Sequence, residues 1–489
     1  MNAPQPRPPP TAAAAAASAS AGPLSRGQFL HLFSAVMLPM IMAAADQTLL
    51  STAAPVIHEE LGGLRDITWL ALSYLLAATV MIPVYGRLGD RYGRRRMLLA
   101  ALAIFVVGSA VCAASTSLTM LILARAFQGI GGGGLMTLCQ ALIGELVVPR
   151  ERARFQGYFA TLFAVANIGG PVLGGLVAHH ANWRWLFIIN LPLSALAWWR
   201  LMSLPAKGGQ PDAPALEDRA GVLLFAGATG LFLWWATAVG QRLPWLSVAN
   251  GAVIALIVAL GVALFWRERS VASPVLPVGL LRIGVVSRCL TAVALNAGAM
   301  LALVFFFPTF LRLVHGVDVA QSGLMMLPLT AGTVVGSLAN GRVVSRTGLP
   351  TLLPAPALAV TSAALLTMAI IRPELWMAVV LTAITGFGMG TVMSSAQILV
   401  QTTAGPKQVG VATAAVSLFR AIGSAGGTAI FGAVVFGVAA AFGDGGDSVT
   451  VTPAASHALG TGFQAGFAAA ALMTAGAALA MARVPKTKV

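Results

Sequence analysis

Apolar segments of about 20 residues follow one another along most of the chain, and short polar stretches separate them. About 20 apolar residues in an α-helix are enough to cross the hydrocarbon core of a bilayer. The pattern predicts fourteen such helices, at residues 30–54, 68–88, 96–116, 118–140, 154–178, 184–203, 220–240, 246–266, 286–312, 320–341, 351–371, 375–399, 408–433 and 461–482.

The positions of Lys and Arg test this count. If the N-terminus is cytoplasmic, 23 of the 30 Lys and Arg residues lie on the cytoplasmic side and 5 on the outer side, while Arg125 and Arg420 lie inside predicted helices. Cytoplasmic loops of membrane proteins are enriched in Lys and Arg. The bias therefore supports an even number of crossings with both termini in the cytoplasm, because one missed helix would invert every later loop.

The residues before the first helix, 1–28, are rich in Pro and Ala and include an uninterrupted run of alanines. They lack the basic segment followed by an apolar segment that marks a cleavable signal peptide. We expect a disordered cytoplasmic tail here, with the first helix serving as its own insertion signal.

The composition agrees with a membrane protein of many spans. Hydrophobic residues make up 58% of the chain and charged residues 9%, and the mean hydropathy is +0.85. The net charge of +15 would suit a nucleic-acid partner, but the basic residues lie in short connections between predicted helices, which argues against one. The three cysteines all fall in apolar segments and show no disulfide or metal-binding spacing.

A basic segment is repeated in corresponding places of two halves of the chain. Residues Gly86–Arg96 follow the second predicted helix, and residues Gly341–Gly348 follow the tenth; both begin with Gly-Arg, then three residues, Arg, one residue and Gly. Glycine allows a tight turn, and the arginines hold it outside the hydrocarbon. The repeat predicts an all-α polytopic protein with helices arranged as 6 + 2 + 6. Its parts would be the tail, an N-terminal bundle at 29–204, a linker and inserted helix pair at 205–285, and a C-terminal bundle at 286–489.

One acidic residue, Asp46, lies deep within a predicted helix. A carboxylate in hydrocarbon costs at least about 2.5–3.5 kcal/mol and usually serves a function. Burial favours its protonated form, which suits a group that gains and loses a proton in each cycle. The alternative is an aspartate that is permanently paired and locks two helices together.

Arg125 is the candidate partner of Asp46. Both residues are predicted to lie about 10–12 Å below the outer surface, so that they could pair directly or through water. Because an arginine favours the charged carboxylate, the proton affinity of Asp46 would depend on whether the pair is formed.

Two glycine-rich stretches lie within predicted helices. Gly131 to Gly134 follow Arg125 and would let helices pack closely in a bilayer. Gly170, Pro171, Gly174 and Gly175 would bend the fifth helix, either as a functional element or as an ordinary kink.

Taken together, these motifs resemble the major facilitator superfamily, and within it the fourteen-helix drug:proton antiporters. The resemblance rests on five stretches: Gly86–Arg96, Arg125–Gly129, Gly170–Gly175, Asp46–Thr48 with Ala54–Pro55, and Asn182–Trp185 with Phe187, Asn190 and Pro192. It implies the major facilitator fold and alternating access between two six-helix bundles, with export driven by proton influx.

The resemblance also implies roles for single residues. Asp46 would be the protonation site and Arg125 its coupling partner. A cytoplasmic latch would close the outward-facing state, formed by Gly86, Asp90, Arg91, Gly93 and Arg94. Ser345 stands in the place of Asp90 in the second copy, which implies a weaker latch there. The antiporter motif would be Gly170, Pro171, Gly174 and Gly175.

A largely apolar substrate cavity is expected in the middle of the molecule. Its polar points are predicted to be Gln128, Asn296, Gln397 and Arg420. Arg420 would contact either this cavity or carbonyl groups at a helix end. Such a cavity suits varied amphipathic compounds.

The sequence therefore predicts a bacterial inner-membrane transporter for multidrug efflux, associated with antibiotic resistance, that exchanges organic compounds such as drugs or amphipathic cations for protons. It would work as a monomer in the lipid bilayer, with small molecules and protons as partners and no nucleic acid, cofactor or metal. The alternatives are a dedicated metabolite or siderophore exporter, a proton-driven importer, and a non-transporting receptor or scaffold. An enzyme is not expected, since no nucleophile–base set, metal cluster or cofactor motif is present.

Overall fold

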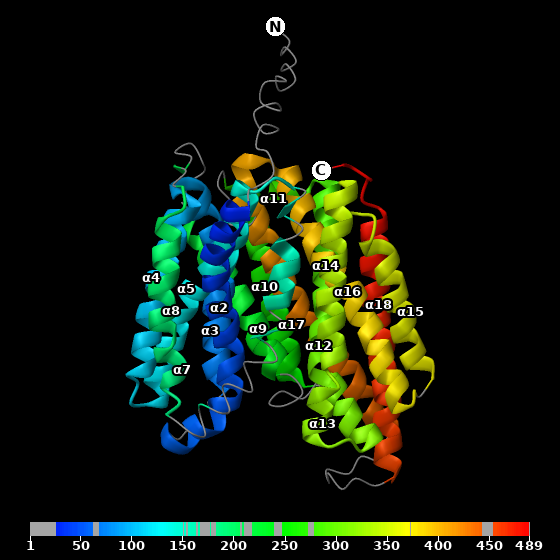
Figure 1. The fold of residues 1–489 in the computed structure, drawn as a ribbon. Helices are drawn as coiled ribbons and strands as arrows, with labels where there is room; N and C mark the ends of the chain where they lie inside the picture. Colours follow the sequence, from blue (N-terminus) through cyan, green and yellow to red (C-terminus); the bar gives the residue numbers. More distant parts are fainter. Residues whose placement is uncertain are drawn as a thin grey trace.

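The computed structural model describes most of the chain as helices and short connections. The described residues are 26–61, 68–149, 151–152, 155–162, 165–166, 177, 182–205, 208–209, 218–238, 247–271, 278–371, 373–442 and 453–488. Figure 1 shows these helices running side by side along one common direction.

Helices from the first half of the chain form one group. They are α2 (Arg26–Leu61), α3 (Thr68–Tyr92), α4 (Arg94–Ala113), α5 (Leu118–Leu146), α7 (Trp185–Ile188) and α8 (Asn190–Met202). Two further helices follow, α9 (Arg219–Ala238) and α10 (Val248–Ser270). The second group comprises α11 (Val278–Leu281), α12 (Gly284–His315), α13 (Val319–Leu324), α14 (Leu327–Thr347), α15 (Pro354–Ile370), α16 (Leu375–Ala404), the 3-10 turn η2 (Pro406–Gln408), α17 (Val409–Phe442) and α18 (Pro453–Ala482).

Among the described residues, eleven helical segments are long and apolar enough to cross a membrane, and two shorter apolar helices cover Ala220–Trp235 and Pro354–Ile370. The prediction of an all-α polytopic membrane protein is thereby confirmed. The count of fourteen and the 6 + 2 + 6 division stay predictions, since most of the helix predicted at 154–178 lies outside the described residues.

Some predicted boundaries differ from the observed ones. The first helix continues to Leu61 instead of ending at 54. Hydropathy ends a predicted span where polar residues begin, whereas backbone hydrogen bonding continues through them. The spans predicted at 184–203 and 320–341 are each divided into two helices, α7 with α8 and α13 with α14.

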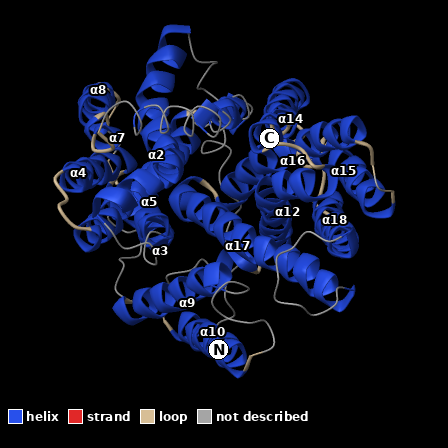
Figure 2. Cartoon of the chain, turned by 90° about the horizontal axis from the view of Figure 1, so that it is seen from below, coloured by secondary structure: helices blue, strands red, loops and turns tan. Residues whose placement is uncertain are grey.

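Viewed along the helices, the two groups lie beside each other, with α17 running along the boundary between them (Figure 2). Helix α9 lies against α3 and α17, and α10 lies outside α9. The first residue of α2 and the last residue of α18 lie at the same end of the molecule, which we call the upper end, as it is drawn in Figure 1.

The basic segment Gly86–Arg96 is helical almost throughout, which corrects the expectation of a loop. Helix α3 continues to Tyr92, and α4 begins at Arg94. Only Gly93 leaves the helical conformation, with a φ of 94° that side-chain-bearing residues rarely adopt. Gly348 has a φ of 70° directly after α14, so the repeated sequence ends in a glycine turn in both halves.

Close packing around α5 explains its run of glycines. A Cβ atom on Gly133 would lie 2.2 Å from the backbone carbonyl oxygen of Ala78 in α3, and one on Gly131 would lie 2.5 Å from the amide nitrogen of Phe105 in α4. Larger residues would push both neighbours away. The glycines thus allow α5 to pack closely between α3 and α4, as expected in a bilayer.

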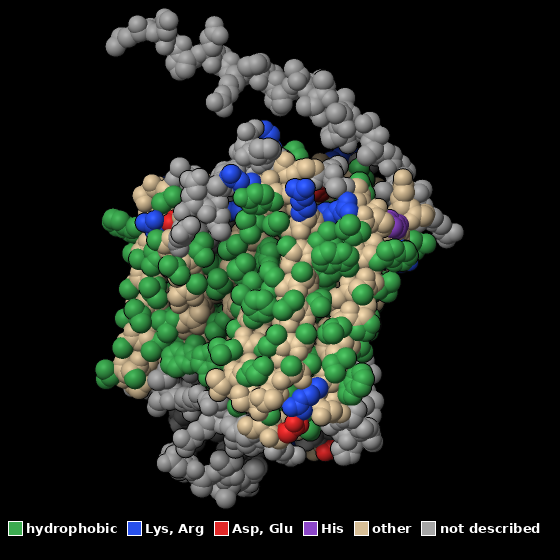
Figure 3. Space-filling model, turned by 90° about the vertical axis from the view of Figure 1, so that its left-hand side faces the viewer, with side chains coloured by type: hydrophobic (Ala, Val, Ile, Leu, Met, Phe, Trp, Pro, Cys, Tyr) green, Lys and Arg blue, Asp and Glu red, His purple; other side chains and the backbone are tan. Residues whose placement is uncertain are grey.

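Figure 3 shows the surface that results. On the face drawn, hydrophobic side chains form a broad band, and most of the visible Lys and Arg side chains lie above it at the upper end. This is the surface of a protein that lies across a membrane.

Candidate functional site

The carboxylate of Asp46 in α2 lies inside the first group of helices, in contact with Arg125 of α5. The Nη1 atom of Arg125 donates a hydrogen bond to Oδ2 of Asp46, and a second one, 2.7 Å long, to Oε1 of Gln128. The Arg125 side chain is 1% exposed and that of Asp46 is 3% exposed. The two residues that the sequence placed at the same depth therefore form a direct, buried ion pair.

Three further polar side chains complete this pocket. The Nε2 atom of Gln128 donates to Oδ1 of Asp46 over 2.9 Å and to Oγ of Ser109 over 2.8 Å. The Nδ2 atom of Asn190 lies 3.4 Å from Oδ1 of Asp46 and 3.3 Å from Oγ of Ser109. The pocket is thus built from four helices, α2, α4, α5 and α8.

Sequence reasoning assigned Gln128 to the substrate cavity, and the structure places it against the Asp46 carboxylate. Asn190 and Ser109 were not among the predicted site residues. Both are buried polar side chains within apolar helices. A polar residue inside an apolar segment needs a hydrogen-bond partner there, and this feature of the sequence could have marked both as candidates.

Arg125 also has contacts that do not depend on Asp46. Its Nε atom donates to the carbonyl oxygen of Leu70 over 3.2 Å, and its guanidinium carbon lies 4.4 Å from the centre of the Tyr74 ring. A cation over an aromatic face is stabilised by the ring. The contacts of Arg125 with Gln128, Leu70 and Tyr74 therefore do not involve the Asp46 carboxylate.

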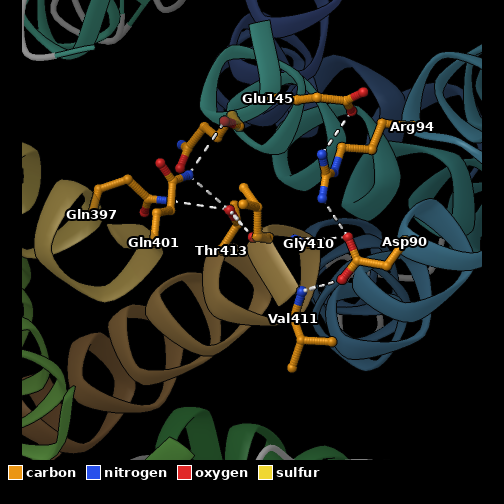
Figure 4. A network of polar contacts seen from close by, with 10 residues as sticks. Asp90, Arg94, Glu145, Gln397, Gln401, Gly410, Val411 and Thr413 are labelled. Carbon is orange, nitrogen blue, oxygen red and sulfur yellow. Dashed lines mark hydrogen bonds and ion pairs between the residues drawn. The ribbon is translucent and has the colours of Figure 1, made fainter. Parts of the chain in front are cut away.

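A second polar network joins the two groups of helices at the upper end (Figure 4). Asp90 near the end of α3 accepts hydrogen bonds from the backbone amides of Gly410, over 3.0 Å, and Val411, over 3.1 Å, in the first turn of α17. Arg94 bridges Asp90 at 2.5 Å and Glu145 of α5 at 2.6 Å. The free amides and the dipole of a helix N-terminus favour an anion, so Asp90 fastens α3 to α17.

Glutamine side chains form a further link beside this network (Figure 4). Gln397 and Gln401 of α16 donate to Oγ1 of Thr413 over 3.2 Å and 2.9 Å. Nη1 of Arg152 lies 3.5 Å from Oε1 of Gln401. Burial lowers the pKa of Arg152 to about 10, and the positive charge of Arg94 acts in the same direction.

The matching place in the second half carries no such link. The hydroxyl of Ser345 donates to the carbonyl oxygen of Arg342 over 2.9 Å, within its own helix. A hydroxyl bonded in this way does not join α14 to another helix, in line with the weaker latch that the resemblance implied for this copy.

Two of the predicted cavity residues, Asn296 and Arg420, take no part in these networks. Nδ2 of Asn296 donates to the carbonyl oxygen of Met389 over 3.2 Å, and Arg420 in α17 is partly exposed and has no hydrogen bond or ion pair with any described residue. The antiporter motif, Gly170, Pro171, Gly174 and Gly175, lies outside the described residues. Among the described part of the chain no three His, Cys, Asp or Glu residues gather where they could hold a metal ion.

At the lower end, Glu60 near the end of α2 holds the segment before α7. It accepts a hydrogen bond of 2.6 Å from Nη1 of Arg184 and another of 2.6 Å from Nε1 of Trp183. These bonds, that of Arg184 first, lower the pKa of Glu60 below its ordinary value of 4.5, against the opposing effect of burial.

This contact predicts a pH-dependent stability. A group whose pKa is lowered by folding stabilises the folded state above its ordinary pKa and loses that contribution as the pH falls through the folded value. We expect Glu60→Gln to lower the melting temperature modestly at pH 7, and the difference from the wild type to shrink below about pH 4.5. Thermal unfolding in detergent from pH 3 to 8 measures this. Glu374→Gln is the control, because Glu374 holds only Trp376, two residues away. A difference that stays constant with pH would contradict the prediction.

Comparison with known proteins supports a transporter fold. The family model described as "Major Facilitator Superfamily" matches residues 36–428. An uncharacterized MFS-type transporter of Mycobacterium tuberculosis (strain ATCC 25618 / H37Rv) is 35% identical over 410 residues, which cover 82% of this chain and 59% of that protein. The chain thus matches somewhat more than half of that relative's length.

Two Bacillus subtilis (strain 168) proteins are also similar. The multidrug transporter protein MdtP is 32% identical over 410 residues, covering 83% of this chain and 75% of its own, and multidrug resistance protein 3 is 28% identical over 408 residues, covering 82% and 78%. Among solved structures, the human organic anion transporter MFSD10 superposes with a TM-score of 0.63 at 16% identity, covering 92% of this chain and 99% of that one. This last likeness shows the shared fold alone.

Proposed function

The chain belongs to the Major Facilitator Superfamily, and we propose from this premise that it exports organic compounds in exchange for protons by alternating access. Members of this superfamily are multi-pass membrane transporters and not enzymes. The proposal adds the direction of transport, the proton coupling and the substrate class. It also assigns the chain to the fourteen-helix drug:proton antiporters of a bacterial inner membrane.

The observation that carries the proposal is the buried Asp46 carboxylate with its three polar partners, Arg125, Gln128 and Asn190. Buried acidic groups in membrane proteins commonly serve proton pathways. The neighbours of Asp46 are able to stabilise the charged form, and Arg125 has other partners when the carboxylate is neutral. A site that accommodates both states is what repeated loading and release of a proton requires.

The network around Asp90 supports the alternating part of the cycle. We propose that the upper end is cytoplasmic, because the basic side chains gather there. The bonds from Asp90 to Gly410 and Val411 would then hold the two groups of helices together on the cytoplasmic side. In this reading Gly86, Asp90, Arg91, Gly93 and Arg94 form the latch of an outward-facing transporter.

The substrate class is proposed from the relatives and the polar residues of the second group. Two relatives are named as multidrug proteins, which supports amphipathic organic compounds as substrates. Asn296, Gln397 and Arg420 are the proposed polar points of the substrate cavity, with Gln128 at its edge. Arg420 is partly exposed and unpaired among the described residues, which favours a second candidate function: dedicated export of one compound that carries an anionic group.

Proton flux in vesicles tests the proposal and separates the two candidates. The purified protein is placed in liposomes that enclose a pH-sensitive dye, and cationic, neutral and anionic amphipathic compounds are added one at a time. Proton movement with several unrelated compounds supports a multidrug exporter. Movement with one anionic compound alone supports the dedicated exporter, and transport without any proton movement would refute the coupling.

A further inference from the structure

Helices α9 and α10 form an antiparallel pair, and side-chain bonds join the two helices to each other near both ends. Near the lower end, Nε1 of Trp235 donates to Oδ1 of Asn250 over 2.7 Å. Near the upper end, Arg267 and Asp218 form a salt bridge of 2.8 Å. Such a pair is able to act as one rigid body.

Most of α10 faces away from the rest of the protein, with the exception of one stripe. Val258 is 57% exposed and Trp266 is 72% exposed. The buried residues of this helix are Asn250, Leu264 and Glu268. Leu264 and Glu268 are four residues apart, so they lie on the same face of α10 near its upper end.

Leu264 takes part in a small hydrophobic cluster that includes both halves of the chain. Its other members are Ile82 of α3, Phe225 of α9, and Ala414 and Leu418 of α17. Helices α3 and α17 are the two elements that Asp90 fastens to each other. The pair α9–α10 therefore lies at the junction of the two halves, and Figure 2 shows α9 beside α3 and α17.

Arg87, a residue of the repeated basic segment, is buried within the electrostatic reach of carboxylates at the upper end of the pair. Arg87 is 8% exposed, and its Nε and Nη1 atoms have no hydrogen-bond partner among the residues that the structure describes. The carboxylates of Glu268, Asp218 and Asp90 all favour its positive charge, whereas burial opposes it. Glu268 and Asp218 are each 3% exposed, and charged side chains are rarely so buried unless an opposite charge compensates them.

The pKa of Asp218 also reflects the positive charges of Arg267 and Arg87. Burial opposes its charge, yet the hydrogen bonds from Arg267 and from the amide of Gly221, together with the charges of Arg267 and Arg87, lower the pKa of Asp218. The α9–α10 pair and the residue before it thus bring two buried carboxylates, Glu268 and Asp218, near Arg87, which lies three residues before Asp90 of the latch.

We propose that the α9–α10 pair is a clamp on the cytoplasmic latch, in which Glu268 and Asp218 position Arg87 while Leu264 and Phe225 hold α3 against α17. Glu268 and Asp218 are positioning residues, since they act through Arg87. This inference rests on the proposed alternating access, because a clamp has an effect only if the latch opens. It gives the inserted helices, which have no counterpart in the repeat, a role in setting how often the cytoplasmic side opens.

Distances across the upper end test the clamp. Cysteines introduced at the exposed positions Arg96 in α4 and Thr347 in α14 carry spin labels, and pulsed electron resonance measures the distance between them in lipid nanodiscs. We expect Glu268→Gln to raise the ratio of the long-distance to the short-distance population about tenfold, which corresponds to about 1.4 kcal/mol. In an Arg87→Gln background, Glu268→Gln is expected to have no further effect.

Leucine substitutions supply the matched control on the same helix. Leu264→Ala is expected to raise the long-distance population, whereas Leu256→Ala, at a position 51% exposed, leaves it unchanged. An unchanged ratio in Glu268→Gln, or an equal effect of this change with and without Arg87, would overturn the clamp. The measurement needs neither substrate nor a proton gradient, so it separates failure of the clamp from failure of the proposed transport activity, which vesicle flux reports.

Discussion

Replacing Asp46 with asparagine is expected to reduce substrate-driven proton movement to the level of protein-free vesicles. Asparagine has nearly the shape of aspartate but neither gains nor loses a proton at physiological pH. Its amide oxygen can still accept a hydrogen bond from Arg125, whose contacts with Gln128, Leu70 and Tyr74 remain. The substitution therefore removes the titrating group with little other change to the pocket.

The same variant should keep a proton-independent activity. Exchange of labelled for unlabelled substrate across the membrane needs the two orientations of the transporter but no net proton transfer. We expect this exchange to persist in Asp46→Asn while uphill transport is lost. Asp46→Glu, which keeps the carboxyl group, should retain part of the coupled transport.

Asp318→Asn is the control for these measurements. Asp318 is an exposed aspartate at the lower end, so the change is chemically identical but lies outside the pocket. It should leave both assays unchanged. Proton-coupled transport that persists undiminished in Asp46→Asn would refute the role of Asp46, and a loss of exchange as well as coupling would point instead to a structural ion pair.

The membrane helices and the depth of Asp46 and Arg125 could be predicted from the sequence, because the bilayer restricts both the backbone and the placing of charges. A long apolar segment has few alternatives to a membrane helix, since hydrocarbon cannot satisfy an open backbone. Asp46 and Arg125 are conspicuous for the same reason. Their positions along two antiparallel helices place them at one level, and the structure shows them in contact.

The contacts at the upper end were harder to predict from the sequence. The charges and glycines of Gly86–Arg96 indicated a turn, yet the segment is helical on both sides of Gly93, and Asp90 and Arg94 form an ion pair between the two helices. The main partners of Asp90 are backbone amides 320 and 321 residues further along the chain. Every residue except proline carries such an amide, so side-chain chemistry does not mark them. The approach of α17 to α3 that creates the contact is a property of the tertiary fold.

The contacts of Gln128 and the burial of Glu268 could also be predicted only in part from the sequence. Gln128 is one turn from Arg125, so its closeness to the pocket was readable, whereas its bond to Asp46 depends on how α2 and α5 are placed. Glu268 lies at the predicted end of an apolar segment, where an acidic residue is ordinary. Its burial becomes evident only when α9 and α10 are seen against α3 and α17.

Replacing Asp90 with asparagine is expected to shift the protein towards conformations that are open at the upper end. The carboxylate accepts two backbone hydrogen bonds from the first turn of α17 and one from Arg94. Asparagine keeps one acceptor oxygen and loses the negative charge. Hydrogen bonds that involve a charged group contribute about 1.5–3 kcal/mol each, so losing one of them should change the open-to-closed ratio about ten- to hundredfold.

Ser345→Ala provides an internal comparison, because Ser345 occupies the place of Asp90 in the second copy of the repeat. Its hydroxyl bonds only to the carbonyl of Arg342, one turn earlier in the same helix. We therefore expect the distance between labels at Arg96 and Thr347 to lengthen in Asp90→Asn and to stay the same in Ser345→Ala. Turnover should fall in Asp90→Asn, since a cycle with a poorly populated closed state releases substrate to the outside less often. Equal distances in the two variants would mean that the latch does not depend on the charge of Asp90, and that other contacts between the two groups hold the upper end closed, such as the one between Arg152 and Gln401 and the hydrophobic cluster around Leu264.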